Sequence, residues 1–204
     1  MTSRTVTALF DSDEDAARAV SELKAGGVAE GDLALVANNA DERYTRADDG
    51  RSDRGSAAGA GASVGTLLGG AAGLLAGLGV LAIPGIGPVV AAGWLVSTAA
   101  GAAAGATAGG LLGALTAAGA SKEQAHFYAE GVRRGGTLVT ARIDDRHLAS
   151  TVEAIMRRNH AVDPVEREKF YREEGWTGFD EQARPFSAEE LARERNIYRA
   201  NLPV

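Results

Sequence analysis

The stretch that decides the fold is residues 60–90, "AGASVGTLLGGAAGLLAGLGVLAIPGIGPVV", which is rich in glycine and contains no charged residue. It lies inside a longer block, residues 55–121, that has no Asp, Glu, Lys or Arg. The chain has 21 basic and 27 acidic residues, so all 48 of its charged residues lie outside that block. The sequence therefore combines charged segments, which suit contact with water, and an uncharged segment, which does not.

Glycine is spaced regularly within this block. A small residue recurs every fourth position, which places one small side chain per turn on one face of a helix. Such a stripe lets two helix backbones approach closely and offsets the low helix propensity of glycine. The expected helix–helix packing residues are Gly61, Gly65, Gly69, Gly73, Gly77, Gly93, Gly101, Gly105, Gly109 and Gly113, with Ser97 filling the gap.

Two prolines and two glycines interrupt the block at "IPGIGP", residues 83–88. Pro84, Gly85, Gly87 and Pro88 are expected to form a turn, because proline ends one helix and can begin the next. The block is thus predicted to be a glycine-zipper helical hairpin over residues 57–120, with helices at about 57–82 and 89–120. Either helix is long enough to cross a hydrocarbon layer of about 30 Å.

Two environments fit such a hairpin. In a membrane, the arginines before the hairpin and Lys122 after it would keep both ends of the chain in the cytoplasm, which predicts a bacterial inner-membrane protein with cytoplasmic soluble parts. Alternatively, the hairpin is buried inside a homo-oligomer of a cytoplasmic protein, which the long alanine runs of the second helix favour. Both readings make a second copy of the chain a partner, and the first adds membrane lipid.

The charged parts of the chain predict a small domain with regular elements. Residues 5–10 and 33–38 alternate as strands, and a helix between them begins at Asp11 or Ser12 and stops at Gly26 and Gly27. Residues 1–38 are therefore a βαβ unit with parallel strands. A polar linker is expected over residues 39–56, which are rich in turn-forming residues.

After the block, residues 121–168 predict an αβαβ unit. The first helix has a capping box of Ser121 and Gln124, a strand follows over 137–143, a second helix covers 145–160, and a weaker strand over 161–166 is placed at a sheet edge by Pro164. The fold class predicted is α+β, as a ferredoxin-like or small open α/β sandwich with the inserted hairpin. The extension over residues 169–204 is charged, carries spaced aromatics, and is expected to drape over the domain or a neighbouring subunit.

The sequence offers little for catalysis. The chain has no cysteine, and its three histidines, at positions 126, 147 and 160, are scattered. The net charge of −6 argues against a nucleic-acid partner. The run 77–82 resembles a dinucleotide-binding fingerprint but neither follows a predicted strand nor opens a helix, and the acids at 11–15 suit a helix N-terminus. His126 is expected to be a packed or interfacial residue rather than a base. The run "GWTGFD" at 175–180 is expected to pack rather than to dock a partner. No catalytic, cofactor-binding or metal-binding residue is predicted, and no cofactor.

Several segments together resemble a known family. The start "TVTALFDSDEDAARAVSELKAGGV", the run "AIPGIGP", the helix–strand run "HFYAEGVRRGGTLVTARI" and the closing "HAVDPVER" resemble the bacterial general or heat-induced stress proteins with a YflT-like domain, over residues 4–168. The resemblance implies a stress-associated bacterial protein with a glycine-rich, membrane-like insert, and it brings no catalytic residues.

The function expected from the sequence is that of a non-enzymatic, stress-associated structural or interaction protein that self-associates through the hairpin at or in the membrane. The alternative is a soluble, oligomeric ligand-binding or regulatory α/β module whose hairpin only drives oligomerisation. No small-molecule ligand is indicated by the sequence.

Overall fold

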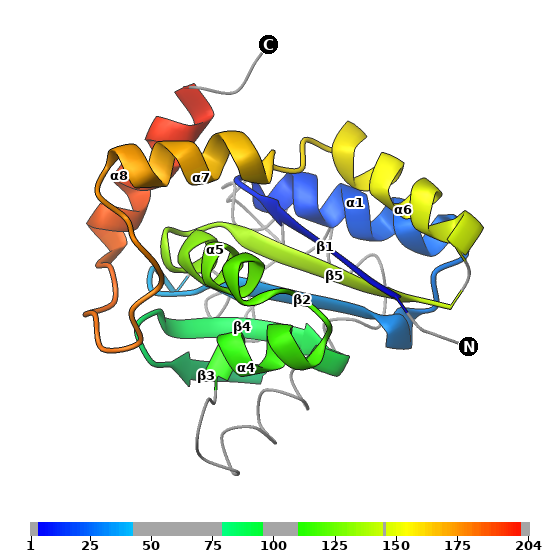
Figure 1. Ribbon diagram of the computed structural model, residues 1–204, viewed down its shortest axis with the longest axis horizontal. Coiled ribbons are helices and arrows are strands. Elements are labelled where there is room, and N and C mark those ends of the chain that lie inside the picture. The colour runs from blue at the N-terminus through cyan, green and yellow to red at the C-terminus, as the bar shows by residue number, and fades with distance from the viewer. Residues whose placement is uncertain (1–3, 43–78, 96–109, 145, 201–204) are drawn as a thin grey trace, which may run out of the picture.

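The computed structural model describes residues 4–42, 79–95, 110–144 and 146–200. The predicted α+β class is confirmed, because these residues form one antiparallel sheet with helices on both faces (Figure 1). The elements in chain order are β1 (Arg4–Phe10), α1 (Asp13–Ala25), the short 3₁₀ helix η1 (Glu30–Asp32), β2 (Leu33–Asn38), β3 (Gly79–Ile83), β4 (Gly87–Gly93), α4 (Gly110–Ala117), α5 (Lys122–Arg133), β5 (Thr137–Ile143), α6 (Arg146–Arg158), α7 (Pro164–Glu173) and α8 (Ala188–Ala200).

The sheet has the strand order β1-β5-β2-β4-β3, and every neighbouring pair is antiparallel. β1 and β2 are therefore parallel to each other, with β5 inserted between them, so the first βαβ unit is a split one. β2 and β3 are related in the same way, with β4 between them. Within the described ranges, β1 and β3 are the two edges of the sheet.

Caps and stop signals explain the ends of the helices. The Ser12 hydroxyl accepts a hydrogen bond from the Asp15 N–H at the start of α1, and Gly26 caps its end. Ser121 and Gln124 form the complete capping box at the start of α5. Each cap satisfies backbone groups that a helix end would otherwise leave without a partner. The cap residues expected from the sequence at these two helices are confirmed.

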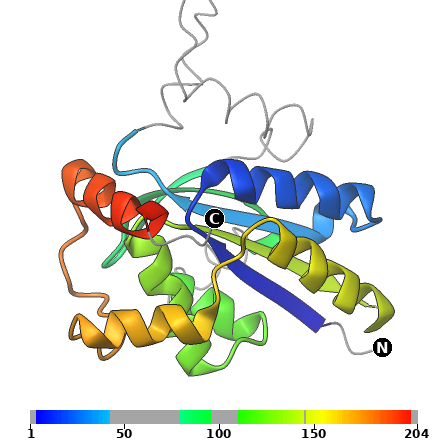
Figure 2. The ribbon, with the colours of Figure 1, turned by 90° about the horizontal axis from the view of Figure 1, so that it is seen from above.

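Helices lie on both sides of the sheet (Figure 2), and two layers of apolar side chains enclose it. One layer joins α1 and α6 to side chains such as Phe10, Leu35 and Val139. The other joins α4, α5, α7 and α8 to Leu9, Val36, Leu138 and their neighbours. β4 contributes to both, since Val90 and Ala92 belong to the first layer and Val89 and Ala91 to the second. Strands in the middle of this fold are thus buried on both faces.

The predicted helical hairpin is wrong at residues 79–93, whereas residues 110–117, expected in its second helix, are the helix α4. Residues 79–82 and 89–93, which were expected to lie in two helices, belong instead to the antiparallel strands β3 and β4. Because both faces of β4 are covered, its side chains need not alternate between apolar and polar, and an uncharged run is what such a strand requires. Its β-branched residues Val89 and Val90 also favour a strand over a helix. The remainder of the expected helices, residues 57–78 and 96–109, lies outside the described residues.

The chain does reverse direction within 83–88, but as a β-turn. The Ile86 N–H donates to the Ile83 carbonyl at 3.1 Å, with Pro84 and Gly85 at the two central positions. Gly85 has a φ of +74°, which is the left-handed conformation that the third residue of a type II turn requires. The Pro-Gly pair that looked like a helix break is therefore a hairpin turn between strands.

A second correction concerns residues 161–166, predicted as an edge strand. Pro164 instead begins helix α7, and the Asp163 carboxylate accepts hydrogen bonds from the Val165 and Glu166 N–H groups. Proline suits the first turn of a helix, because its missing N–H would have no partner there in any case. The predicted αβαβ unit is thus α5, β5, α6 and α7. Among the described residues, no helix is both long enough and apolar enough to cross a membrane.

Candidate functional site

The two ends of the β3–β4 hairpin have different surroundings. At the turn end, Gly85 is buried under the C-terminal extension, and a Cβ built on it would lie 2.5 Å from the Asp180 carbonyl oxygen. A Cβ on Gly87 would lie 2.9 Å from Pro185. Residues 179–185 therefore cover the turn, and a turn so covered cannot also be the tip of a membrane-crossing hairpin.

The other end of the hairpin is where the two uncharged segments attach. Residues 57–78 lead into Gly79, and residues 96–109 follow soon after Gly93. Gly79 pairs with Ala91, so both segments join the domain at the same end of the hairpin. In the opposite direction, Asn38 pairs with Val89 near the turn, so the chain leaves β2 at one end of the sheet and returns in β3 at the other. The points at which these two segments join β3 and β4 thus lie at one corner of the sheet, beside the edge strand β3.

The expected packing glycines are distributed as follows. Gly113 lies on α4 and is half-buried, while Gly93 ends β4. The zipper role predicted for Gly93 is wrong, because its φ is +86° and a Cβ there would collide with the Leu33 carbonyl oxygen on the neighbouring strand. Gly93 is a strand-end glycine that lets β2 approach. The remaining eight lie outside the described residues: Gly61, Gly65, Gly69, Gly73, Gly77, Gly101, Gly105 and Gly109.

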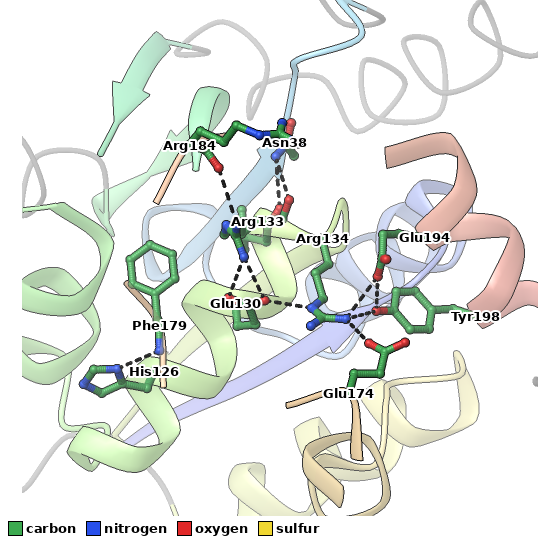
Figure 3. A network of polar contacts seen from close by, with 11 residues as sticks. Asn38, His126, Glu130, Arg133, Arg134, Glu174, Phe179, Arg184, Glu194 and Tyr198 are labelled. Atoms are coloured by element: carbon green, nitrogen blue, oxygen red, sulfur yellow. Dashed lines mark hydrogen bonds and ion pairs between the residues drawn. The ribbon is translucent and has the colours of Figure 1, made fainter. Parts of the chain in front are cut away.

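A network of charged side chains gathers at the end of α5 and was not predicted (Figure 3). Arg134 donates through Nε to the Glu130 carboxylate at 2.7 Å, and through Nη1 to Glu174 at 2.5 Å and to Glu194 at 3.2 Å. The Glu130 side chain is only 1% exposed. Arg134 also stacks over the Tyr171 ring, at 4.4 Å from its centroid. One guanidinium therefore joins α5 to the end of α7 and to α8.

Other arginines extend the network on both sides. Arg133 donates to Glu130 at 3.2 Å and lies over the Phe186 ring. Arg167 on α7 holds Asp11 through two hydrogen bonds, at 2.8 and 2.6 Å. Arg195 on α8 donates to the Gly135 carbonyl at 3.0 Å and to Asp41 at 2.7 Å. Since each arginine crosses from one element to another, the network fastens the C-terminal helices to the domain.

The tyrosines in this region are shifted by burial. Burial raises the pKa of Tyr171 to about 12, and it also raises the pKa of Tyr128 to about 12. The pKa of Tyr198 is raised further by burial and by its hydrogen bond to Glu194. Burial lowers the pKa of Arg134, but its bonds to Glu130, Tyr198 and Glu174 outweigh burial and raise it above its usual range. These shifts keep the arginine charged and the tyrosines neutral, which is the state in which the network holds together.

The remaining candidates from the sequence are packed. The Phe179 N–H donates to Nδ1 of His126 at 3.1 Å, so His126 fixes the extension to α5. Trp176 of the "GWTGFD" run lies edge-on to Tyr171, with centroids 5.8 Å apart, and Phe179 is buried. A shallow polar groove of about 230 Å³ lies beside β1, between Thr5, Thr7, Gln124 and Tyr128. That volume is below the range usual for small-molecule pockets.

Metal binding finds no support in the described part of the chain, where no group of three or more His, Asp or Glu side chains is placed to hold an ion. Comparisons with protein-family models, with curated proteins and with solved structures found no significant match to this chain.

Proposed function

We propose that this protein is a non-catalytic structural or interaction protein, an α+β module that self-associates through its two uncharged glycine- and alanine-rich segments, residues 57–78 and 96–109. One observation carries the proposal. The β3–β4 hairpin holds Gly79 opposite Ala91, so both segments join the domain at the same corner of the sheet. Two charge-free segments that join a charged domain at one corner are suited to contact with another copy.

The polar groups of the domain support the non-catalytic part of the proposal. Catalytic groups need a partner that can be exchanged for substrate. Here, Arg134 is shared among three carboxylates, and Arg167 is held by both oxygens of Asp11. His126, the histidine beside the buried aromatics, accepts a backbone hydrogen bond. These side chains hold different elements of the chain together, which favours a structural role over a catalytic one.

The association with bacterial stress is proposed from the sequence alone, through the resemblance of residues 4–168 to the YflT-like stress proteins. The alternative function, a ligand-binding or regulatory module, would use the polar groove beside β1. We place it second because that groove is small and because the Arg4–Glu153 ion pair, at 2.9 Å, lines it.

A pair of leucine substitutions tests the role of the glycine stripe. Gly105 lies on the four-residue row with Gly101 and Gly109, whereas Ala103 lies about 160° away round a helix. We expect Gly105→Leu to lower the temperature at which oligomers dissociate, because the larger side chain forces two backbones apart. Ala103→Leu should have a much smaller effect. The measurement is thermal dissociation followed by chemical cross-linking.

Leucine is a better helix former than glycine by up to about 1 kcal/mol, so propensity alone would stabilise Gly105→Leu, whereas alanine is the best helix former and propensity alone would slightly destabilise Ala103→Leu. Equal losses of oligomer at positions 103 and 105 would show that the four-residue spacing has no packing role, and the proposed contact would then be wrong.

A further inference from the structure

We propose that the free edge of β3 is the surface on which two copies of this chain join, by antiparallel pairing of β3 with the β3 of the second copy. This inference rests on the self-association proposed above and adds to it a second contact, made by the described strand that directly follows residues 57–78. The two edges of the sheet differ in whether their outward backbone N–H and C=O groups have partners.

The β1 edge is blocked by its own chain. The Tyr128 hydroxyl donates to the Thr7 carbonyl at 2.9 Å, and the Val162 N–H donates to the Leu9 carbonyl at 2.8 Å. At the start of the strand, Arg4 is paired with Glu153. Capped carbonyls and a charged residue are the devices by which natural sheets prevent an edge from pairing with another chain.

The direction of the backbone groups of β3 follows from the ladder. The Asn39 N–H donates to the Pro88 carbonyl, so the C=O group of Pro88 points toward β2. The N–H and C=O groups of its neighbours in β4 point toward β3. Residues of an antiparallel strand alternate in this way, so Leu81 opposite Val89, and Ile83 opposite Gly87, point their groups toward β4. The N–H and C=O groups of Val80 and Ala82 therefore point away from the sheet.

These outward groups have none of the protection seen at β1. The strand "GVLAI" contains neither a charged residue nor a proline, and Ala82 is exposed. No hydrogen bond from any described residue caps Val80 or Ala82. Among the described residues, the sheet therefore has one capped edge and one open edge, and strand addition is expected at the open one.

A second copy fits this edge better than a charged partner does. The chain carries a net charge of −6, and its charged residues all lie outside 55–121, so β3 adds no charge of its own to a contact between two copies. Pairing across a two-fold axis at Leu81 sets Val80 of one copy against Ala82 of the other, and each pair exchanges both hydrogen bonds. Because the described part of each copy has one open edge, the contact is isologous and closes as a dimer rather than growing into a fibre.

Ala82→Pro tests this directly, because proline removes the outward N–H and leaves the groups of Leu81 and Ile83 that bond to β4. Ala82→Thr, which keeps the N–H, is the matched control. Thr5→Pro, which removes an outward N–H from the β1 edge, is the control for the other edge. We expect at least a tenfold rise in the dimer dissociation constant for Ala82→Pro, since each copy loses a donor. Both controls should associate as the wild type does.

Sedimentation velocity gives the dissociation constants, and circular dichroism with thermal melting shows whether each variant is folded. A folded Ala82→Pro that associates like the wild type would overturn the β3 contact while leaving self-association intact. A wild type that does not associate would overturn the proposed function itself. If Ala82→Pro does not fold, Ala82→Lys decides, because it keeps the N–H and places a charge on the edge: weaker association supports the β3 contact, and unchanged association overturns it.

Discussion

A chain in which residues 55–121 are deleted, with 54 joined to 122 by a short flexible linker, should fail to fold cooperatively. The sequence alone leads to the opposite expectation, since the charge-free block looks like an insert between two halves that have their own caps and strands. The structure overturns it, because the block supplies β3, β4 and α4. Buried side chains of these elements and of the residues beside them belong to the same apolar layer as α5; they include Ile86, Val89, Leu95, Leu111 and Leu115, each at most 2% exposed.

Each of these side chains contributes about 1.5–3 kcal/mol by burial, and together they rival the whole stability of a domain, about 5–15 kcal/mol. The deletion also strips β2 of its neighbour β4 and turns a central strand into an open edge. Thermal melting by circular dichroism and solubility after expression are the measurements. A soluble product with a sharp melting transition would show that β3, β4 and α4 are not needed for the fold.

Arg134→Ala should destabilise the protein by about 3–5 kcal/mol, the usual cost of removing one partner from a buried ion pair. The substitution leaves the Glu130 carboxylate, which is almost fully buried, without its 2.7 Å partner. It also frees Glu174 and Glu194 from the same guanidinium and removes the stacking on Tyr171. The contacts of Arg134 hold α7 and α8 to the domain, so their loss should lower the free energy of unfolding. Unfolding in urea measures that free energy.

Arg172→Ala is the matched control, because Arg172 is also an arginine that pairs with a glutamate but lies on the surface, with a side chain 62% exposed. Exposed pairs of this kind contribute about 0–1 kcal/mol. Comparable losses for the two variants would mean that the Arg134 network does not fasten the C-terminal helices.

The parts of the fold that local pattern determines could be predicted. The strand at 33–38 and the strand at 137–143 have the bounds expected from their apolar runs. The starts of α1 and α5 follow from Ser12 and Ser121, whose side chains cap the helices as short-range chemistry predicts. In each case the signal lies within a few residues of the element that it specifies.

The parts of the fold that depend on contacts with distant residues could not be predicted. β4 is apolar on both faces because α5 lies on one side of the sheet and the α1 layer on the other, and nothing within 87–93 reveals that. The partners of Arg134 lie 40 and 60 residues further along the chain, at Glu174 and Glu194. Only the Glu130–Arg134 spacing of four, an acid and a base on one face of a helix, was visible in the sequence as a signal of this network.

Hairpin and helix signals also compete at 83–88. Pro84 and Gly85 suit a type II turn as well as they suit a helix break, and the strand interpretation depends on pairing with β2, which lies more than forty residues earlier in the chain. Without that pairing, the glycine spacing on either side favoured a helix. The prediction was wrong because the local glycine spacing favours a helix, whereas the pairing with β2 that makes this segment a strand cannot be read from the sequence.

The molar mass of the full chain in solution, measured by light scattering at micromolar concentration, tests the central claim of self-association most directly. The account predicts a mass of at least twice the 20.9 kDa of one chain, falling toward that value on dilution. A single species of 20.9 kDa at every concentration would contradict it.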